Sequence, residues 1–211
     1  MRMGIQNVYC VGRNYKLHAE ELGNDVPTEP MIFLKPSHAV VKADGQVLEM
    51  PAGRGEIHYE TELVIRIGRP YEKGIDIQEL VDVAALGIDF TLRDVQNVLK
   101  KKGQPWTAAK GFRNSAPVTS YFALPDKEEL ESKDFTLLLN GQEVQRGNVK
   151  NMIFSLQTIV DYIAEHYGLG EGDLIFTGTP EGVGPVAAGD KLELAWDGTV
   201  LGSCLIGSKE N

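Results

Sequence analysis

Residues 57–67 have the sequence IHYETELVIRI, in which two acidic residues lead into an apolar run. The run Leu63–Ile67 is short and mostly apolar, which predicts a buried strand. Glu60 and Glu62 stand two residues apart at the start of this strand. Because successive side chains of a strand point to opposite faces, the two carboxylates are expected on the same face.

Similar short apolar runs, bounded by Gly, Pro, Asn or Asp, recur along the chain, and each predicts a further strand. They are Met31–Leu34, Phe135–Leu139 and Leu174–Phe176, together with a buried-looking run from Ala84 that ends at Asp89. The pair Asn140-Gly141 follows Leu139 and is typical of a tight hairpin. The chain is therefore expected to be mostly β.

Four segments carry helical signals. They are Tyr15–Leu22, Ile77–Ala85 after the N-cap Asp76, Thr91–Lys102 before Gly103, and Ser155–Tyr167 with Ser155 as N-cap. These helices do not alternate regularly with the strands, so a doubly wound sheet is not expected. Neither a GxGxxG nor a Walker sequence occurs, which disfavours a nucleotide cofactor. With no repeat or linker in sight, we expect residues 1–211 to form a single catalytic domain of mostly β (α+β) class.

The composition is that of a globular protein, with 42% hydrophobic and 24% charged residues. The net charge of −9, without a basic stripe, disfavours nucleic-acid binding. No apolar stretch approaches the roughly 20 residues that span a bilayer, and the N-terminus lacks the regions of a signal peptide, so a cytoplasmic protein that binds no membrane is expected. Cys10 and Cys204 lie in apolar runs and are expected to be buried free thiols.

The paired carboxylates predict a metal site. Two like charges on a partly buried face repel, and a cation between them would remove that cost. A hard divalent ion, Mg²⁺ or alternatively Mn²⁺, suits oxygen ligands best. The competing interpretation is a solvated strand face. Asp89 could supply a third ligand or cap the next helix. If residues 89–96 are helical, Asp89, Arg93 and Gln96 share one face. His58 could donate to the carboxylates or, as we favour slightly, lie on the surface.

Three further groups could carry chemistry. His18 and Glu21 stand three apart in a predicted helix, so the carboxylate could orient the imidazole as a general base; an exposed polar helix is the alternative. Lys110, set between small and aromatic residues, could bind a carboxylate or stabilise an oxyanion, or could be a surface lysine. Thr179 lies in a glycine-rich turn whose N–H groups could hold a carboxylate, a bare turn being the alternative.

Taken together, these segments resemble the fumarylacetoacetate hydrolase family. The matching pieces are residues 11–15 (VGRNY), 33–36 (FLKP), 58–63 (HYETEL), 89–96 (DFTLRDVQ), 109–112 (AKGF) and 177–184 (TGTPEGVG). They lie in the family's order over nearly the whole chain. The resemblance is strongest to short, single-domain members that act as acylpyruvases and as oxaloacetate decarboxylases or tautomerases. Members that act in aromatic-acid breakdown are also similar.

The resemblance implies a mixed β-sheet roll, of the type of the family's C-terminal domain, and a homodimer. It also implies roles for particular residues. The metal ligands would be Glu60, Glu62 and Asp89, the catalytic pair on a short lid helix His18 and Glu21, and the substrate site Arg93, Gln96, Lys110 and Thr179. The lid segment 22–27 is the least diagnostic part, which leaves the substrate open.

The leading hypothesis is Mg²⁺-dependent hydrolysis of a C–C bond in an acylpyruvate-type 2-oxo acid, such as acetylpyruvate or fumarylpyruvate. The ion would stabilise an enolate, His18 with Glu21 would activate water, and Lys110 would stabilise the oxyanion. The same enolate could serve oxaloacetate decarboxylation, enol–keto tautomerisation, or an isomerase or decarboxylase of the 2-hydroxyhepta-2,4-diene-1,7-dioate type. A non-enzymatic alternative is an ion-stabilised binding module. Product analysis distinguishes these hypotheses.

Overall fold

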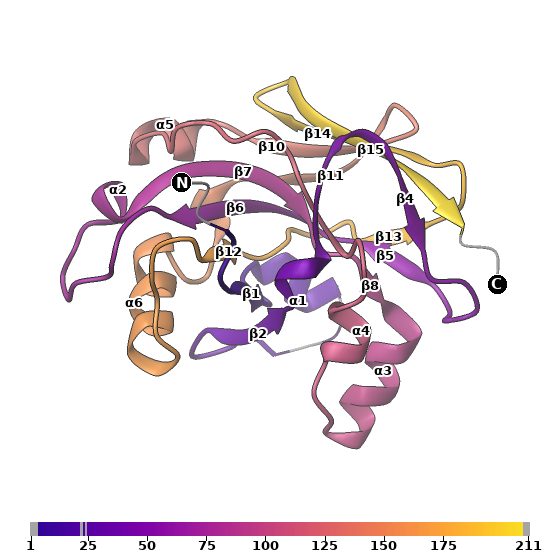
Figure 1. The fold of residues 1–211 in the computed structure, drawn as a ribbon, viewed down its shortest axis with the longest axis horizontal. Helices are drawn as coiled ribbons and strands as arrows, with labels where there is room; N and C mark the ends of the chain where they lie inside the picture. The colour runs from indigo at the N-terminus through magenta and orange to yellow at the C-terminus, as the bar shows by residue number, and fades with distance from the viewer. Residues whose placement is uncertain (1–3, 22, 24, 209–211) are drawn as a thin grey trace.

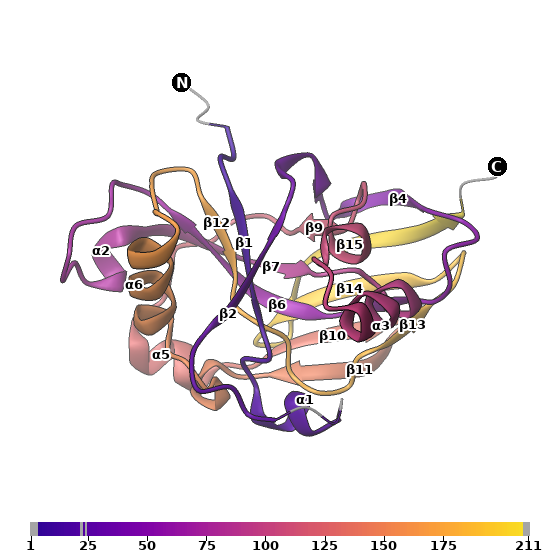
Figure 2. The same ribbon diagram turned by 90° about the horizontal axis from the view of Figure 1, so that it is seen from below.

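The computed structural model describes residues 4–21, 23 and 25–208. Within these residues the chain forms a seven-stranded sheet of order β2-β1-β12-β6-β7-β9-β3, a five-stranded sheet of order β11-β10-β14-β15-β4 and a three-stranded sheet of order β13-β5-β8. Figures 1 and 2 show the sheets curled around one another, with α5 and α6 at one end of the molecule and α3 and α4 at the other. The expected mostly β fold, a roll of mixed sheets with few helices, is confirmed.

The bounds of the elements are as follows. The strands are β1 (Val8–Gly12), β2 (Met31–Lys35), β3 (Val40–Lys42), β4 (Asp44–Met50), β5 (Ile57–Tyr59), β6 (Thr61–Ile67), β7 (Val81–Ile88), β8 (Thr91–Leu92), β9 (Ala116–Val118), β10 (Phe135–Leu139), β11 (Gln142–Gly147), β12 (Leu174–Phe176), β13 (Gly184–Val186), β14 (Lys191–Trp196) and β15 (Thr199–Ser208). The helices are α1 (Lys16–Glu21), α2 (Ile77–Leu80), α3 (Arg93–Lys102), α4 (Thr107–Lys110), α5 (Lys127–Ser132) and α6 (Leu156–His166), with 3₁₀ turns η1 (Ser37–Ala39) and η2 (Val149–Asn151).

Strand β6 is buried on both faces, which explains its apolar sequence. Leu63, Ile65 and Ile67 are fully buried in the main hydrophobic core. Val64, between them, packs into a smaller cluster on the other face that includes Phe176. The seven-stranded sheet is therefore covered on both sides here, and a carboxylate that extends from this strand is kept from water.

Two neighbouring segments of the chain, β5 to β6 and β7 to β8, each pass from one sheet into another. In the three-stranded sheet β5 pairs with β8, and in the seven-stranded sheet β6 pairs with β7, both antiparallel. The chain changes sheets at Glu60, between β5 and β6, and again at Asp89, between β7 and β8. The backbone N–H of Asp89 donates to the carbonyl of Glu60 at 2.8 Å. The bend thus sets these two acids opposite each other.

The predicted strands and the hairpin are present, and two of the helices are corrected. Asn140 and Gly141 form a two-residue turn, with Leu139 paired to Gln142. The expected helix Ile77–Ala85 ends at Leu80, because Val81 joins β7 and pairs with Ile67 of β6. Burial in a sheet has overridden the local helical signal.

The second corrected helix is Thr91–Lys102, which begins at Arg93 because the first two residues form β8. In α6, by contrast, the predicted N-cap Ser155 accepts a hydrogen bond from the Thr158 N–H. Cys10 and Cys204 are buried free thiols, as predicted. Of the helices in the described part of the chain, none has the length and apolar character needed to cross a membrane.

Candidate active site

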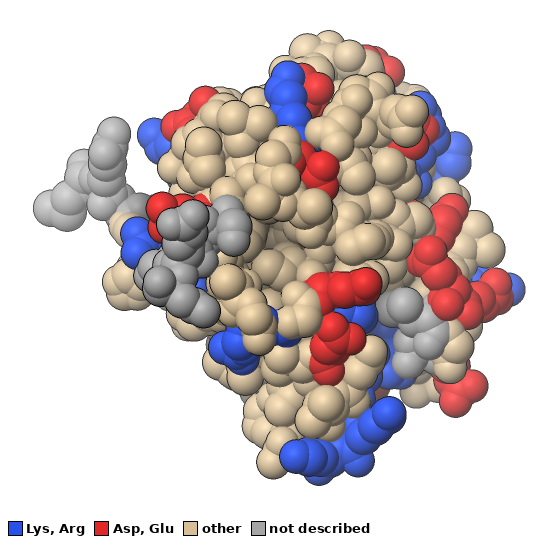
Figure 3. Space-filling model, turned by 90° about the vertical axis from the view of Figure 1, so that its right-hand side faces the viewer, with Lys and Arg blue, Asp and Glu red and all other residues tan. Residues whose placement is uncertain are grey.

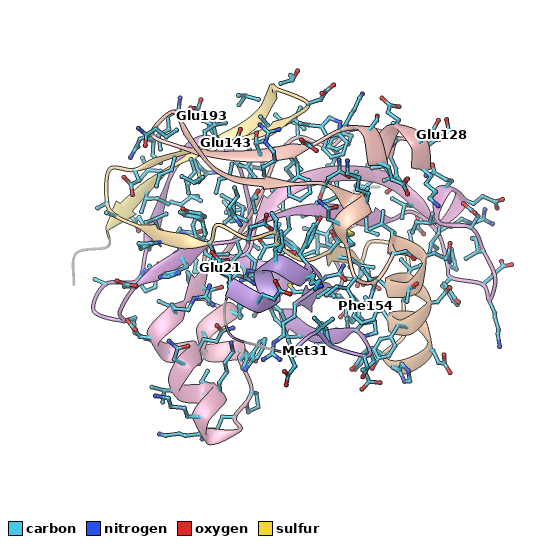
Figure 4. All side chains as sticks on the ribbon, turned by 180° about the vertical axis from the view of Figure 1, so that it is seen from behind. Glu21, Met31, Glu128, Glu143, Phe154 and Glu193 are labelled. Atoms are coloured by element: carbon cyan, nitrogen blue, oxygen red, sulfur yellow. The ribbon has the colours of Figure 1, made fainter. Side chains whose placement is uncertain are left out.

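A narrow pocket at the bend between the sheets collects nearly all the residues singled out from the sequence. Its lining includes His18, Glu60, Glu62, Asp89, Arg93, Gln96, Lys110 and Thr179. Glu21 lies beside the pocket on α1, and Met31, the first residue of β2, forms part of the lining. Figure 4 labels both residues, with Glu21 beside α1 and Met31 below that helix. Segments far apart in the sequence therefore converge on one cavity.

The three predicted metal ligands lie together. Glu60, Glu62 and Asp89 are all buried, and one carboxylate oxygen of each lies within 4.8 Å of the others. Glu60 and Glu62 flank the start of β6, and Asp89 reaches them from the end of β7. Asp89 is not on a helix, so the predicted shared helical face holds only for Arg93 and Gln96, whose side chains are hydrogen-bonded at 2.7 Å.

Three buried cations surround these acids. The Lys110 ammonium lies 2.7 Å from Glu60 Oε2 and 2.6 Å from Asp89 Oδ2. The Arg93 guanidinium lies 2.5 Å from Glu60 Oε1. The Lys35 ammonium lies 2.7 Å from Asp89 Oδ1. Glu60 and Asp89 are therefore compensated by neighbouring positive charge, as buried charges must be.

Glu62 has no such partner within salt-bridge distance among the described residues. Its Oε2 instead accepts a hydrogen bond from the Gly178 backbone N–H at 2.7 Å. Burial and the nearby Asp89 charge raise the pKa of the Glu62 carboxyl well above its usual value, although the Gly178 hydrogen bond opposes this. Burial also raises the pKa of the Glu60 carboxyl, but the charges of Lys110 and Arg93 outweigh that effect and hold it below its usual range.

This donor set fits a hard divalent cation. It offers only carboxylate oxygens, the ligands that Mg²⁺ and Mn²⁺ prefer. Asp89 Oδ1 is buried and makes no well-aligned hydrogen bond among the described residues, although Lys35 is near enough for an ion pair. Burial and then the charge of Asp89 raise the pKa of Glu62, and a cation between the three acids would offset both effects. The role of the three acids as ligands stays a prediction.

Two loops complete the floor of the pocket, because β1 and β12 are parallel neighbours and end at the same edge of the sheet. The Asn14 side chain, after β1, donates to the Thr177 carbonyl, after β12, at 2.8 Å. Gly178 has a φ of +106°, and a Cβ on it would lie 2.6 Å from that of Asn14. Glycine is therefore required where this loop turns its N–H toward Glu62.

His18 and Glu21 are neighbours, as the helical spacing predicted, and the role of Glu21 in orienting the imidazole stays a prediction. Both residues lie on α1, with His18 Nδ1 at 3.5 Å from Glu21 Oε2. The Gly182 N–H donates to the Glu21 carboxylate at 3.1 Å, which ties the helix to the glycine-rich turn. His18 is only 4% exposed. Burial lowers the pKa of His18 despite the opposing charges of Glu60 and Glu21, so the imidazole is kept neutral and able to accept a proton.

The glycine-rich turn contributes differently from the expectation. Its N–H groups bind carboxylates of the protein itself, namely Glu62 and Glu21. The Thr179 hydroxyl accepts a hydrogen bond from Gln145 Nε2 at 2.9 Å, and Gln145 Oε1 accepts the Thr61 N–H at 2.8 Å. Gln145 thereby links Thr179 to the start of β6, a connection that no local sequence signal indicates.

Sequence reasoning also missed Lys35 and underestimated His58. Lys35 is fully enclosed and donates to the carbonyls of Phe90 and Lys110 besides pairing with Asp89. A lysine at the end of an apolar strand, directly before a proline, is the signal that could have indicated it. His58 is half-buried: its Nε2 lies 3.0 Å from Oε2 of the exposed Glu56, and its Nδ1 accepts from Arg93 Nε at 3.4 Å.

The sequence of this chain is similar to those of several known proteins. The family model described as fumarylacetoacetate (FAA) hydrolase C-terminal matches residues 7–206. The chain is 37% identical over 202 residues to the oxaloacetate tautomerase of Escherichia coli (strain K12), covering 93% of this chain and 91% of that protein. It is 42% identical over 200 residues to the mitochondrial oxaloacetate tautomerase of Mus musculus, covering 92% and 89%.

A solved structure shares both the fold and much of the sequence. The fumarylpyruvate hydrolase of Pseudomonas aeruginosa, solved in complex with Mn²⁺ and pyruvate, superposes with a TM-score of 0.89 at 36% sequence identity. The similarity covers 97% of this chain and 91% of that one.

Proposed function

The chain belongs to the fumarylacetoacetate hydrolase family, and we propose that it is a metal-dependent enzyme that interconverts the enol and keto forms of oxaloacetate. The observation that carries this proposal is the buried His18, which Glu21 orients, lining the same pocket as three carboxylates suited to a divalent ion. The similarity to oxaloacetate tautomerases supports this choice of reaction over the others open to the site.

Glu60, Glu62 and Asp89 would hold the ion, Mg²⁺ or Mn²⁺. When bound, it would supply Lewis-acid polarisation of the 2-oxo acid and fix its orientation. The fumarylpyruvate hydrolase structure, which holds Mn²⁺, supports a divalent ion in this fold. The identity of the ion in this protein is part of the proposal.

His18 moves the proton. Because its Nδ1 faces Glu21, Nε2 is the ring nitrogen left to take a proton from C3 of the keto acid. As the C2–C3 double bond forms, the electron pair of the carbonyl moves onto the C2 oxygen, which receives the proton back from the His18 imidazolium, and the reverse steps return the keto form. Lys110 and Arg93 offer N–H donors to the charge that develops on oxygen. No water is consumed, and no C–C bond breaks.

Hydrolysis of an acylpyruvate, the leading hypothesis from the sequence, becomes the second candidate. The likeness to fumarylpyruvate hydrolase favours it, because the same His18–Glu21 pair could activate a water molecule for attack on the distal carbonyl. The relatives that carry the name oxaloacetate tautomerase favour the proton transfer instead. Decarboxylation of oxaloacetate is the third outcome to be measured.

The test is product analysis with Mg²⁺ or Mn²⁺ present. Enol-oxaloacetate is mixed with the protein, the ultraviolet absorbance of the enol is followed, and the keto acid, pyruvate and CO₂ are quantified. We expect catalysed ketonisation without stoichiometric pyruvate, abolished by chelator and slowed about 10²–10⁴-fold by His18→Ala. Stoichiometric pyruvate and CO₂ would indicate decarboxylation instead. Turnover of fumarylpyruvate or acetylpyruvate to pyruvate and an acid, without enol loss, would indicate hydrolysis.

Activity of any of these kinds would also argue against an ion-stabilised binding module, which needs neither His18 nor Glu21. The proposal further includes one catalytic domain over residues 1–211 and assembly as a homodimer. Light scattering during gel filtration tests the dimer: a mass near twice the 23.2 kDa of the chain is expected, and a mass of one chain would contradict it.

A further inference from the structure

We propose that Arg13 and Lys100 form an anion subsite that binds the second carboxylate of a dicarboxylic 2-oxo acid, which makes the enzyme selective for dianionic substrates. This inference rests on the proposed function, since it names the class of substrate that the same pocket accepts.

The charge pairing within the pocket is the first observation. Four cationic residues line it, namely Arg13, Arg93, Lys100 and Lys110. Arg93 and Lys110 are committed to ion pairs with Glu60 or Asp89. Within the part of the chain that the structure describes, no carboxylate oxygen lies within 4.0 Å of the charged atoms of Arg13 or Lys100. Within the described residues, their two positive charges are therefore not neutralised by an ion pair.

Arg13 is held in a conformation that few side chains adopt. Its φ is +58°, in the left-handed region, which costs free energy for any residue other than glycine and persists only where the surroundings impose it. The surroundings here are the hydrogen bonds of Asn14, which donates to the carbonyls of Thr177 and Phe154 and accepts the Phe154 N–H. The Nε of Arg13 is buried and has no hydrogen-bond partner among the described residues.

Lys100 lines the same pocket from the last turn of α3. Its ammonium lies 5.5 Å from the centre of the Trp106 ring, which also lines the pocket. Burial, and then the nearby charges of Arg13 and Arg93, lower the pKa of Lys100, so an anion between them would be stabilising. Lys101 and Lys102, in the same turn, are exposed. Figure 3 shows Lys and Arg atoms gathered at this lower end of the molecule, over α3.

A carboxylate suits this pair. The guanidinium can donate two parallel hydrogen bonds to one carboxylate, and a lysine beside it adds a compact positive charge. The carboxylate cluster, with its ion, would take the 2-oxo acid end of the substrate, and the second carboxylate would lie toward Arg13 and Lys100. Oxaloacetate and fumarylpyruvate have a second carboxylate, whereas acetylpyruvate has a methyl group there.

The experiment compares two stable ligands that differ only at this point. Malate and 2-hydroxybutyrate share a four-carbon 2-hydroxy acid skeleton, and 2-hydroxybutyrate carries a methyl group where malate has its second carboxylate. Calorimetric Kd values are measured with Mg²⁺-loaded parent, Arg13→Met, Lys100→Met and the control Lys102→Met. Circular dichroism melting checks that each variant is folded, and KM for oxaloacetate is measured in parallel.

We expect Arg13→Met and Lys100→Met each to weaken malate binding about tenfold or more, the worth of a hydrogen bond to a charged group. The Kd for 2-hydroxybutyrate should stay within about twofold, as expected if the lost contact involves only the absent carboxylate. Arg13→Lys should recover part of the malate affinity, and Lys102→Met should change the Kd of neither ligand.

Equal shifts for both ligands, or no shift in either variant, would overturn the subsite, as would a parent that does not prefer malate. The binding experiment needs no turnover. A parent that prefers malate through Arg13 and Lys100 but does not interconvert enol- and keto-oxaloacetate would therefore refute the proposed function and leave the subsite standing.

Discussion

Lys110 shows how a buried charge is accommodated at the level of a single residue. Its ammonium is enclosed beside Glu60 and Asp89, and it lies 5.1 Å from the centre of the Phe33 ring. Burial alone lowers the pKa of Lys110, but the charges of Asp89 and Glu60 outweigh it and raise the pKa above its usual value. The lysine is therefore charged at neutral pH, and the lysine and the two acids stabilise one another in their charged forms.

Removing that charge should destabilise the protein. Without added metal, we expect Lys110→Met to lower the free energy of unfolding by about 3–5 kcal/mol, because two buried carboxylates lose a partner. Urea unfolding in chelator measures this loss. Lys127→Met removes an exposed lysine that pairs with Glu131 at 3.8 Å, and the change should stay within about 0.5 kcal/mol. A loss for Lys110→Met no larger than the control's would contradict this account.

The His18 variant tests the proposed general base. We expect His18→Ala to lower kcat about 10²–10⁴-fold, the usual contribution of such a base, with the circular dichroism spectrum unchanged. His166→Asn, at the exposed end of α6, should leave kcat unchanged. Enol loss at saturating oxaloacetate measures both. A kcat for His18→Ala within about threefold of the parent would contradict the assignment, given the contribution expected of a base.

The pH profile tests the same residue in another way. The neutral imidazole is the active form, so activity is full above the pKa of His18 and is lost as the pH falls through it. Because burial lowers that pKa, the acid limb of kcat/KM should lie below about pH 6.5, the ordinary value for histidine. The residual activity of His18→Ala should lack this limb, and an identical limb in the variant would assign it to another group.

At the level of elements, the position of the site follows from the two places where the chain passes from one sheet into another. The β5–β8 and β6–β7 pairs lie in different sheets, with Glu60 and Asp89 at the two places where the chain passes between them, and the register sets Glu62 opposite Gly87. A Cβ on Gly87 would lie 2.7 Å from the Phe176 ring and 2.8 Å from a methyl of Val64. The strand can pass beneath the site only because this position lacks a side chain.

Helix α6 lies at the opposite end of the molecule from α3, so its stability can be changed separately from activity. Ser155→Ala removes the N-cap hydrogen bond at 3.1 Å and should cost about 1 kcal/mol. For a chain of this length that lowers Tm by about 2–4 °C. Melting curves measure the change, and Ser155→Asp, which keeps a capping oxygen, should largely restore Tm. An altered kcat in Ser155→Ala would show that the helix is coupled to the site.

At the level of the whole molecule, metal binding should stabilise the fold, because the three acids come together only when the sheets are assembled. At about one hundred times its Kd, Mg²⁺ or Mn²⁺ should add about 2.7 kcal/mol and raise Tm by about 5–10 °C. Chelator should reverse the shift. The quantity to compare is this metal-induced shift, since replacing a strained buried acid can itself alter Tm.

Glu62→Gln should abolish most of that shift, whereas Glu128→Gln, on the exposed surface of α5, should retain it. A parent whose Tm does not respond to either ion would rule out the carboxylate cluster as a metal site. Because the readout is thermal, this result is independent of which substrate the enzyme uses.

Several features of this protein were determined by neighbouring residues alone and could be predicted from the sequence. Apolar runs predicted the strands, Asn140-Gly141 the hairpin, and Ser155 the start of α6, because each depends on interactions within a few residues. Glu60 and Glu62 were placed on one side of the chain by alternation, and His18 with Glu21 by helical spacing. The ordered set of motifs predicted the family.

Only the tertiary structure decided how these parts meet. Lys35 reaches Asp89, and Gln145 links Thr179 to Thr61, through contacts between distant segments that no local pattern encodes. The same long-range pairing converted Val81 and the residues after it from a predicted helix into β7, because a buried place beside β6 is worth more than local propensity. The bend between two sheets, and with it the site, exists only once the strands have paired.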